Sequence, residues 1–206
     1  MNLTREEARH RSEIIKVERY HVRIDVRGAD ADGATHFTSN TRVRFSTTEP
    51  DTFLDLLDGE IESVIVNGEE VEPEYDGSRI QLHGLHTHRE NLVIVTAKLP
   101  YQHTGQGLHR FVDPADGKVY LYTHFEAADS RRMYSVFEQP DLKAHVDFDV
   151  IAPSDWRVAS NQVHEDSSGG GRWPPARFRP HPEDVNLSHR HCCRPLRQVP
   201  RRVALS

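Results

Sequence analysis

The feature that most constrains the fold of this 206-residue chain is a two-residue alternation of apolar and polar side chains. In "VERYHVRIDV" the apolar side chains fall mainly on one face of an extended strand, and "THFTSNTRVRFST" repeats the pattern. Such segments are typical of half-buried β-strands. The same signal predicts strands, in chain order, at Val17–Val26, Thr35–Thr47, Ile61–Val66, Ser78–Leu85, Asn91–Tyr101, Val119–Phe125, Lys143–Pro153 and Trp156–Asn161.

Turn and cap signals complete this pattern. Asn67-Gly68 directly follows a predicted strand and indicates a hairpin, because its turn type needs positive φ angles. One helix is predicted from Thr4 to about Ile14, where Thr4 and Glu7 are placed to form a capping box. Turn residues recur at the spacing typical of a sandwich or barrel. We therefore predict an all-β domain of antiparallel strands, in two packed or strongly curved sheets, with a short N-terminal helix.

Charge and composition narrow the possible partners. Residues 1–171 carry a net charge of −12, which disfavours nucleic acid as a partner, whereas residues 172–206 contain eight Arg, no Lys and two acidic residues. Apolar runs stay well short of the roughly 18 residues that span a bilayer, so no membrane partner is expected. The first 20 residues lack the apolar region of a secretory signal, and a cytoplasmic location is the resulting expectation.

Motifs for metal binding or catalysis are weak. A helical zinc-protease site needs H-E-x-x-H, but the chain offers only "HEDSS" at His164–Ser168, which runs into glycines. The run "HRHCC", residues 189–193, has suitable donors in an Arg/Pro-rich segment that should not fold alone. Neither a nucleophile elbow nor a phosphate-binding loop occurs. We therefore predict no catalytic and no metal-ligating residue in this chain.

A set of linked motifs between Gly107 and Asn161 is more specific. In order they are "GLHR" at Gly107, "THFE" at Thr123 with "DSRR" at Asp129, "FEQPD" at Phe137 with Lys143-Ala144, and Ser160-Asn161. Together they resemble the N-terminal domain of the aminopeptidase N family of zinc metallopeptidases, most closely the actinobacterial type. The resemblance covers about Asn2 to Trp173. It implies a saddle-like β domain over residues 16–173, preceded by a helical arm over residues 1–15.

The resemblance also implies a role for the charged stretch between the strands. In this family the N-terminal domain leans on a thermolysin-like catalytic domain and forms one wall of the substrate pocket. Glu126 falls on the family glutamate that helps to hold the free α-amine of the peptide substrate, a task suited to a carboxylate. His124 stands where the family has Gln, and an imidazole both accepts and donates only when neutral. The two residues are thus the predicted substrate-binding positions.

Other interpretations of the same charges stay open. Glu126 could instead pair with Arg131 or Arg132. Arg132, Glu138 and Asp141 are interpreted as structural ion pairs rather than catalytic groups.

The sequence after Trp173 departs from the family. When residues 178–196 are back-translated with permitted codons and the nucleotides are read one base later, they can encode the family segment "FAPTPKMSTYLTAIVAGPY". We therefore interpret residues 174–206 as an aberrant, disordered tail produced by a frameshift. The family's catalytic domain and its zinc-binding motif are not present. The predicted function is therefore that of an inactive fragment of a zinc aminopeptidase, binding no zinc itself. The alternative is a stand-alone β-sandwich that serves as a binding or scaffold module.

Overall fold

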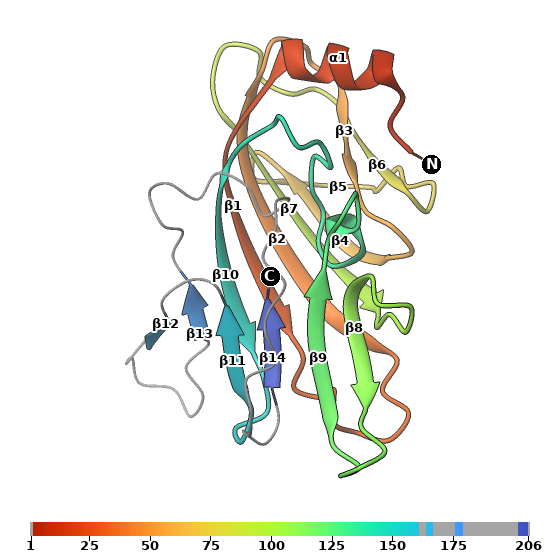
Figure 1. Cartoon of the computed structure of the whole chain (residues 1–206). Coiled ribbons are helices and arrows are strands. Elements are labelled where there is room, and N and C mark those ends of the chain that lie inside the picture. Colours follow the sequence, from red (N-terminus) through yellow and green to blue (C-terminus); the bar gives the residue numbers. More distant parts are fainter. Residues whose placement is uncertain (1, 161–163, 167–175, 179–201, 206) are drawn as a thin grey trace.

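The structure, a computed structural model, describes residues 2–160 and the backbone of residues 164–166, 176–178 and 202–205. Helix α1 (Arg5–Ile14) begins at the predicted capping box. The Thr4 hydroxyl accepts a hydrogen bond from the Glu7 N–H (3.2 Å), and the Thr4 N–H donates to the Glu7 carboxylate (2.8 Å). The chain then passes directly from α1 into the long strand β1 (Ile15–Asp25), as Figure 1 shows.

The strands form three sheets. The largest has the order β12-β13-β10-β1-β2-β7-β4-β5, the second β11-β14-β9-β8, and the third pairs β3 with β6. Each strand predicted from the sequence is confirmed by a strand in one of these three sheets. The bounds are β2 (His36–Thr47), β3 (Thr52–Asp55), β4 (Glu60–Val66), β5 (Glu69–Val71), β6 (Arg79–Leu82), β7 (Asn91–Pro100), β8 (Gly107–Val112), β9 (Val119–His124), β10 (His145–Ile151), β11 (Arg157–Ser160), β12 (His164–Asp166), β13 (Ala176–Phe178) and β14 (Arg202–Leu205).

The all-β prediction is confirmed, but one part of the expected topology is wrong. Most neighbours in the large sheet are antiparallel, such as β1 with β2 and β2 with β7, whereas β1 and β10 run parallel with Tyr20 opposite Val146. A tight turn forces antiparallel pairing, as in the β4–β5 hairpin, where Asn67 (φ 53°) and Gly68 (φ 95°) form the predicted turn. β1 and β10 lie far apart in the sequence, so no local turn fixes their relative direction.

A single apolar core joins the three sheets. In β1 and β2 the alternation buries Val22, Ile24 and Phe45, as the sequence pattern predicted. The same cluster includes buried side chains from the smaller sheets, among them Leu54 of β3 and Leu121 of β9. The segment between β9 and β10 contributes further apolar residues to it, namely Phe125, Met133, Tyr134, Val136 and Phe137. The charged connection is therefore folded into the domain rather than looped away from it.

The predicted tail, residues 174–206, lies mostly outside the described residues, as does the segment interpreted as frameshifted. Both stay predictions. Of this region the structure gives the backbone of β13, which pairs with β10, and of β14, which pairs with β9 and β11. In the described part of the chain, no helix is long and apolar enough to cross a membrane.

Candidate functional site

The segment that joins β9 to β10 begins with an exposed turn that carries Glu126. Phe125 is buried, whereas His124 at the end of β9 and Glu126 are both exposed. The peptide bond between Glu126 and Ala127 is cis. The two residues singled out from the sequence thus lie close together on the surface, where another molecule can reach them.

The two arginines that follow are engaged elsewhere. Arg132 lies at the end of the short 3-10 helix η1 (Ser130–Arg132), and its Nε donates to the carboxylate of Asp129 at 2.7 Å. Its other end lies 3.7 Å from the Asp58 carboxylate. Arg131 Nε donates to the carbonyl oxygen of Ala128 at 2.9 Å. Within residues 2–160 the structure places no ion pair on Glu126.

Gly107 fixes η1 close to the start of β8. Its φ angle is +57°, and a Cβ atom there would lie 2.7 Å from the Cβ of Arg132. Any larger residue would have to push η1 away while adopting an unfavourable backbone conformation. Gly107 also lies opposite His124 in the β8–β9 register. The "GLHR" motif therefore begins with a glycine because β8 and η1 approach each other here.

Glu138 organises the interior of the segment. Its Oε2 accepts hydrogen bonds from the hydroxyl of Ser130 and from the N–H of Arg131, the latter at 2.8 Å. Burial raises the pKa of Glu138, partly offset by these hydrogen bonds. The interpretation of Arg132 as part of a structural ion pair is supported by its contact with Asp129. Among residues 2–160, the contacts of the Glu138 carboxylate are these hydrogen bonds and no ion pair.

Helix α1 anchors the same segment through a buried ion pair. Arg11 Nη1 lies 2.8 Å from Asp55 Oδ2, and both side chains are 2% exposed. Arg11 Nε donates to the side-chain oxygen of Gln139 at 3.0 Å. The Asp55 carboxylate also accepts the N–H of Glu138 at 3.0 Å. Sequence reasoning missed Arg11 because it sits on a helix whose other side chains are mostly charged and exposed.

Asp141 connects the segment to α1 as well. Its Oδ2 accepts a hydrogen bond from the hydroxyl of Ser12 and another from the amide of Gln139 at 3.2 Å. The Ser12 hydrogen bond is the main reason that the pKa of Asp141 is lowered. Asp141 is thus held by neutral donors.

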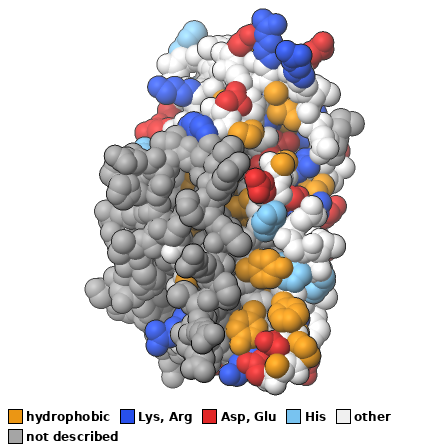
Figure 2. All heavy atoms as spheres, in the orientation of Figure 1, with side chains coloured by type: hydrophobic (Ala, Val, Ile, Leu, Met, Phe, Trp, Pro, Cys, Tyr) orange, Lys and Arg blue, Asp and Glu red, His pale blue; other side chains and the backbone are white. Residues whose placement is uncertain are grey.

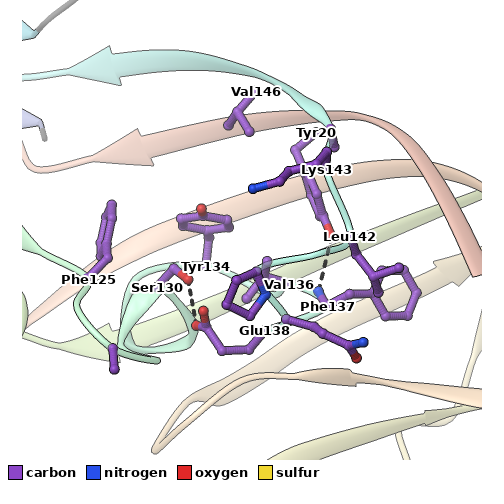
Figure 3. Close-up of a pocket in the computed structure, with 14 residues that line it drawn as sticks. Tyr20, Phe125, Ser130, Tyr134, Val136, Phe137, Glu138, Leu142, Lys143 and Val146 are labelled. Carbon is purple, nitrogen blue, oxygen red and sulfur yellow. Dashed lines mark hydrogen bonds between the residues drawn. The ribbon is translucent and has the colours of Figure 1, made fainter. Parts of the chain in front are cut away.

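A pocket of about 80 Å³ opens beside this segment (Figure 3). Phe125 and Ala127, the two chain neighbours of Glu126, both line it, and the hydrogen bond between Ser130 and Glu138 lies along one side. Burial raises the pKa of Tyr134, another lining residue. Ligand pockets usually measure about 300–1,000 Å³, so this one is too small to hold a peptide. The exposed surface around Glu126, unlike this pocket, is open to a larger molecule.

The described residues do not fit a zinc site. They contain no group of three or more His, Cys, Asp or Glu side chains that could hold a metal ion. His103 and His109 come close, with ring centroids 6.2 Å apart, but Nδ1 of His109 accepts the N–H of Gly105 and Nδ1 of His103 contacts the carbonyl oxygen of Arg110. The donors considered at residues 164–168 and 189–193 lie outside the residues whose side chains are described.

The sequence profile of the peptidase M1 N-terminal domain matches residues 18–182. The chain belongs to this family. Aminopeptidase N of Streptomyces lividans is 45% identical over 164 residues, which are 78% of this chain and 19% of that protein. A probable aminopeptidase 1 of Saccharolobus solfataricus is 27% identical over 162 residues, again 19% of its length. The chain thus spans about one fifth of the relatives that it matches.

Solved structures of M1 peptidases share the fold of this M1 N-terminal domain. An M1 zinc metallopeptidase from Deinococcus radiodurans superposes with a TM-score of 0.61 at 14% identity, covering 81% of this chain and 39% of that one. A two-domain M1 zinc metallopeptidase bound to L-tryptophan gives 0.62 at 16% identity over the same shares. Aminopeptidase A of Legionella pneumophila in complex with aspartic acid gives 0.61 at 15% identity, covering 80% and 19%.

Proposed function

We propose that this chain is the substrate-facing N-terminal domain of a zinc aminopeptidase, a peptidase that removes N-terminal residues from peptides. Catalysis would require a second portion of the protein, with its zinc ion, that follows the matched segment in the relatives. On this proposal the isolated chain is inactive. Its partners are the N-terminus of a peptide and the catalytic portion, and the cytoplasmic location remains part of the proposal.

The observation that carries the proposal is the state of Glu126. Its carboxylate is exposed on the turn after β9 and has no ion pair among residues 2–160. The sequence resemblance aligns Glu126 with the family glutamate. An unpaired carboxylate can accept hydrogen bonds from the α-ammonium group of a peptide, and a bond between two charged groups fixes the end of the substrate. Next to Glu126 in the chain, Asp129 at the end of the turn accepts a hydrogen bond from Arg132, and Gly107 leaves room for the Arg132 side chain.

His124 would take the place of the family glutamine in the same contact. It ends β9 two residues before Glu126, and both side chains are exposed. A neutral imidazole can accept one hydrogen bond and donate another, as an amide does, but with one nitrogen for each role. We therefore assign His124 to the contact around the first substrate residue, with a geometry different from that of glutamine.

The test is a chimaera in which residues 2–173 of this chain, the part that resembles the family, replace the corresponding segment of the Streptomyces lividans aminopeptidase N. It should release chromophore from aminoacyl anilides. Glu126→Ala in the chimaera should lower kcat/KM roughly 10- to 100-fold, the loss expected for one hydrogen bond to a charged group. Glu70→Ala, at an exposed glutamate of β5, is the matched control and should have no effect.

Two results would contradict the proposal. One is a folded, zinc-loaded chimaera that hydrolyses no aminoacyl anilide although the parent enzyme does. The other is a Glu126→Ala chimaera with unchanged kcat/KM, because the carboxylate then makes no productive contact with the substrate.

A further inference from the structure

The last strand of the chain, β14, lies between two other strands of the second sheet. It separates β11 from β9 and runs parallel to both, as Figure 1 shows. Residues 202–205 pair with residues 157–160 of β11, and residues 203–204 pair with residues 121–122 of β9. Among the described residues, β14 is the strand through which β11 joins this sheet. The end of the chain thus fills a space one strand wide, which we call the strand slot, with β9 and β11 as its two walls.

The two walls of the strand slot are fixed by contacts that do not involve β14. On one side, β9 pairs with residues 107–112 of β8, and Leu121 of β9 is buried in the core. On the other side, Trp156 is buried directly before β11, and Val158 of β11 packs against the same core. Both walls should therefore stay in place if residues 202–205 leave the slot. A site with fixed walls loses little conformational entropy when a segment enters it.

An empty strand slot would leave backbone groups without hydrogen-bond partners. β9 and β11 would each present a row of N–H and C=O groups to it, and unpaired strand edges of this kind readily bind another extended segment. Binding by strand addition recognises a peptide mainly through its main chain. The slot therefore favours a segment that can extend fully. It disfavours proline, which lacks the N–H that a central strand donates.

The sequence at the end of the chain meets this requirement. Residues 174–201 contain six prolines, whereas "RVAL" at residues 202–205 contains none and includes a β-branched valine. Figure 2 shows hydrophobic side chains on the surface over β8 and β9, where Phe111, Val112 and Tyr122 are exposed. A residue bound opposite Tyr122 shares a face of the sheet with it, so an apolar segment suits this position.

The segment that fills the strand slot is also free to be exchanged. Residues 161–201 separate β11 from β14, so no short turn ties the two strands together. β14 pairs with β9 at two positions and with β11 at four. Parallel pairs are slightly less stable per residue than antiparallel ones. A separate peptide could therefore take the place of β14.

We propose that the strand slot is a peptide-binding site, which takes an extended, proline-free apolar segment in parallel with β9 and β11. In this chain the site is filled by residues 202–205, which act as an internal ligand. The slot would bind such a segment whether or not Glu126 contacts a peptidase substrate.

The first test removes the internal ligand. Amide hydrogen exchange, resolved by residue with NMR, is compared between the 206-residue chain and a chain that ends at Arg201. The amides of β11, and those of β9 that point toward β11, should exchange roughly tenfold or more faster in the shortened chain. The amides of β2, in the middle of the large sheet, should not change. Equal exchange of β9 and β11 in the two proteins would overturn the proposal.

A variant of the full-length chain makes the same test without a deletion. Ala204→Pro removes a backbone N–H from the middle of β14 and should also speed exchange of the β9 and β11 amides that face the strand slot. Ser206→Pro, placed after β14, is the matched control and should leave this exchange as it is in the wild type. If Ala204→Pro behaves like Ser206→Pro, residues 202–205 do not fill the slot.

The second test supplies the ligand as a separate molecule. A fluorescein-labelled peptide of residues 201–206, "RRVALS", should bind the shortened chain. It should bind the 206-residue chain roughly tenfold or more weakly, because only molecules with an open slot can accept it. The same peptide with Ala204→Pro should not bind the shortened chain. Equal affinity of the two peptides, or binding of neither, would overturn the proposal.

Light scattering decides whether the ligand is internal. The 206-residue chain should be monomeric, with exchange of the β11 amides that does not depend on protein concentration. A dimer in which these amides lose protection on dilution would show that a second copy supplies the strand, and would contradict the assignment of residues 202–205 as an internal ligand.

Discussion

The protonation of His109 makes the stability of the domain depend on pH. Burial and the neighbouring His103 lower its pKa, and its Nδ1 must stay unprotonated to accept the N–H of Gly105. The unfolded chain takes up this proton near pH 6.5, whereas the folded protein does so only at lower pH. The contribution of His109 to stability is therefore lost as the pH falls through 6.5, and it levels off below the folded pKa.

The corresponding prediction concerns His109→Asn, which keeps an acceptor near the position of Nδ1 but does not titrate. The free energy of unfolding of this variant should decrease less than that of the wild type between pH 7.5 and 5. At pH 7.5 it should be lower by about 0.5–1.5 kcal/mol because the stacking on Tyr122 is lost. Urea denaturation at several pH values measures both effects, with the exposed His88→Asn as control. Parallel pH profiles for wild type and His109→Asn would contradict this account.

Glu138 affects the pH dependence of stability in the opposite direction from His109. Burial raises its pKa, so the folded state holds this proton more tightly than the unfolded state, and the associated stability falls as the pH rises through the folded pKa. Glu138→Gln retains an oxygen that can accept from Ser130 and Arg131, and should be at least as stable as the wild type at pH 7 with a flatter pH profile. Glu138→Ala should cost about 1–3 kcal/mol because both donors lose their acceptor. Thermal melts of the two variants decide the point; equal destabilisation by both would show that the carboxylate charge itself is needed.

At the scale of elements, α1 and the segment between β9 and β10 are joined through Arg11 and Asp55. Arg11→Met should destabilise the domain by about 3–5 kcal/mol, because it leaves the buried Asp55 carboxylate without its partner. Arg9→Met breaks an exposed pair with Glu13 on the same helix and should cost less than about 0.5 kcal/mol. Denaturant titrations of the two variants make the comparison. If both variants lower the free energy of unfolding by the same small amount, α1 does not anchor the segment between β9 and β10.

The sequence predicted elements better than their connections. Alternation and the Asn67-Gly68 turn located the strands because both signals are local. The parallel pairing of β1 with β10 could not be predicted in this way, since it depends on residues far apart in the chain. The role of Arg11 was hidden for the same reason: its partners Asp55 and Gln139 come from two distant segments. Glu126 and His124 were found through a motif, and the structure adds their exposure.

At the scale of the whole molecule, the chain matches about one fifth of the length of the M1 aminopeptidases that it resembles, and the proposed function makes it one part of such an enzyme. The described residues provide a folded β domain and an exposed carboxylate at Glu126, but no group of side chains able to hold zinc. Every step that cleaves a peptide bond is assigned to the portion that the relatives carry outside the matched segment. On the proposed function the domain positions the substrate, and this contribution should be measurable only when both portions are present.

The most direct measurement of this claim is hydrolysis by the purified 206-residue chain. The chain is incubated with one equivalent of zinc and an aminoacyl anilide, beside the Streptomyces lividans chimaera at the same concentration. The chimaera should release chromophore, and the chain alone should release none above the buffer rate. Release by the chain alone that is abolished by a chelator would contradict it, because the catalytic groups would then lie within these 206 residues.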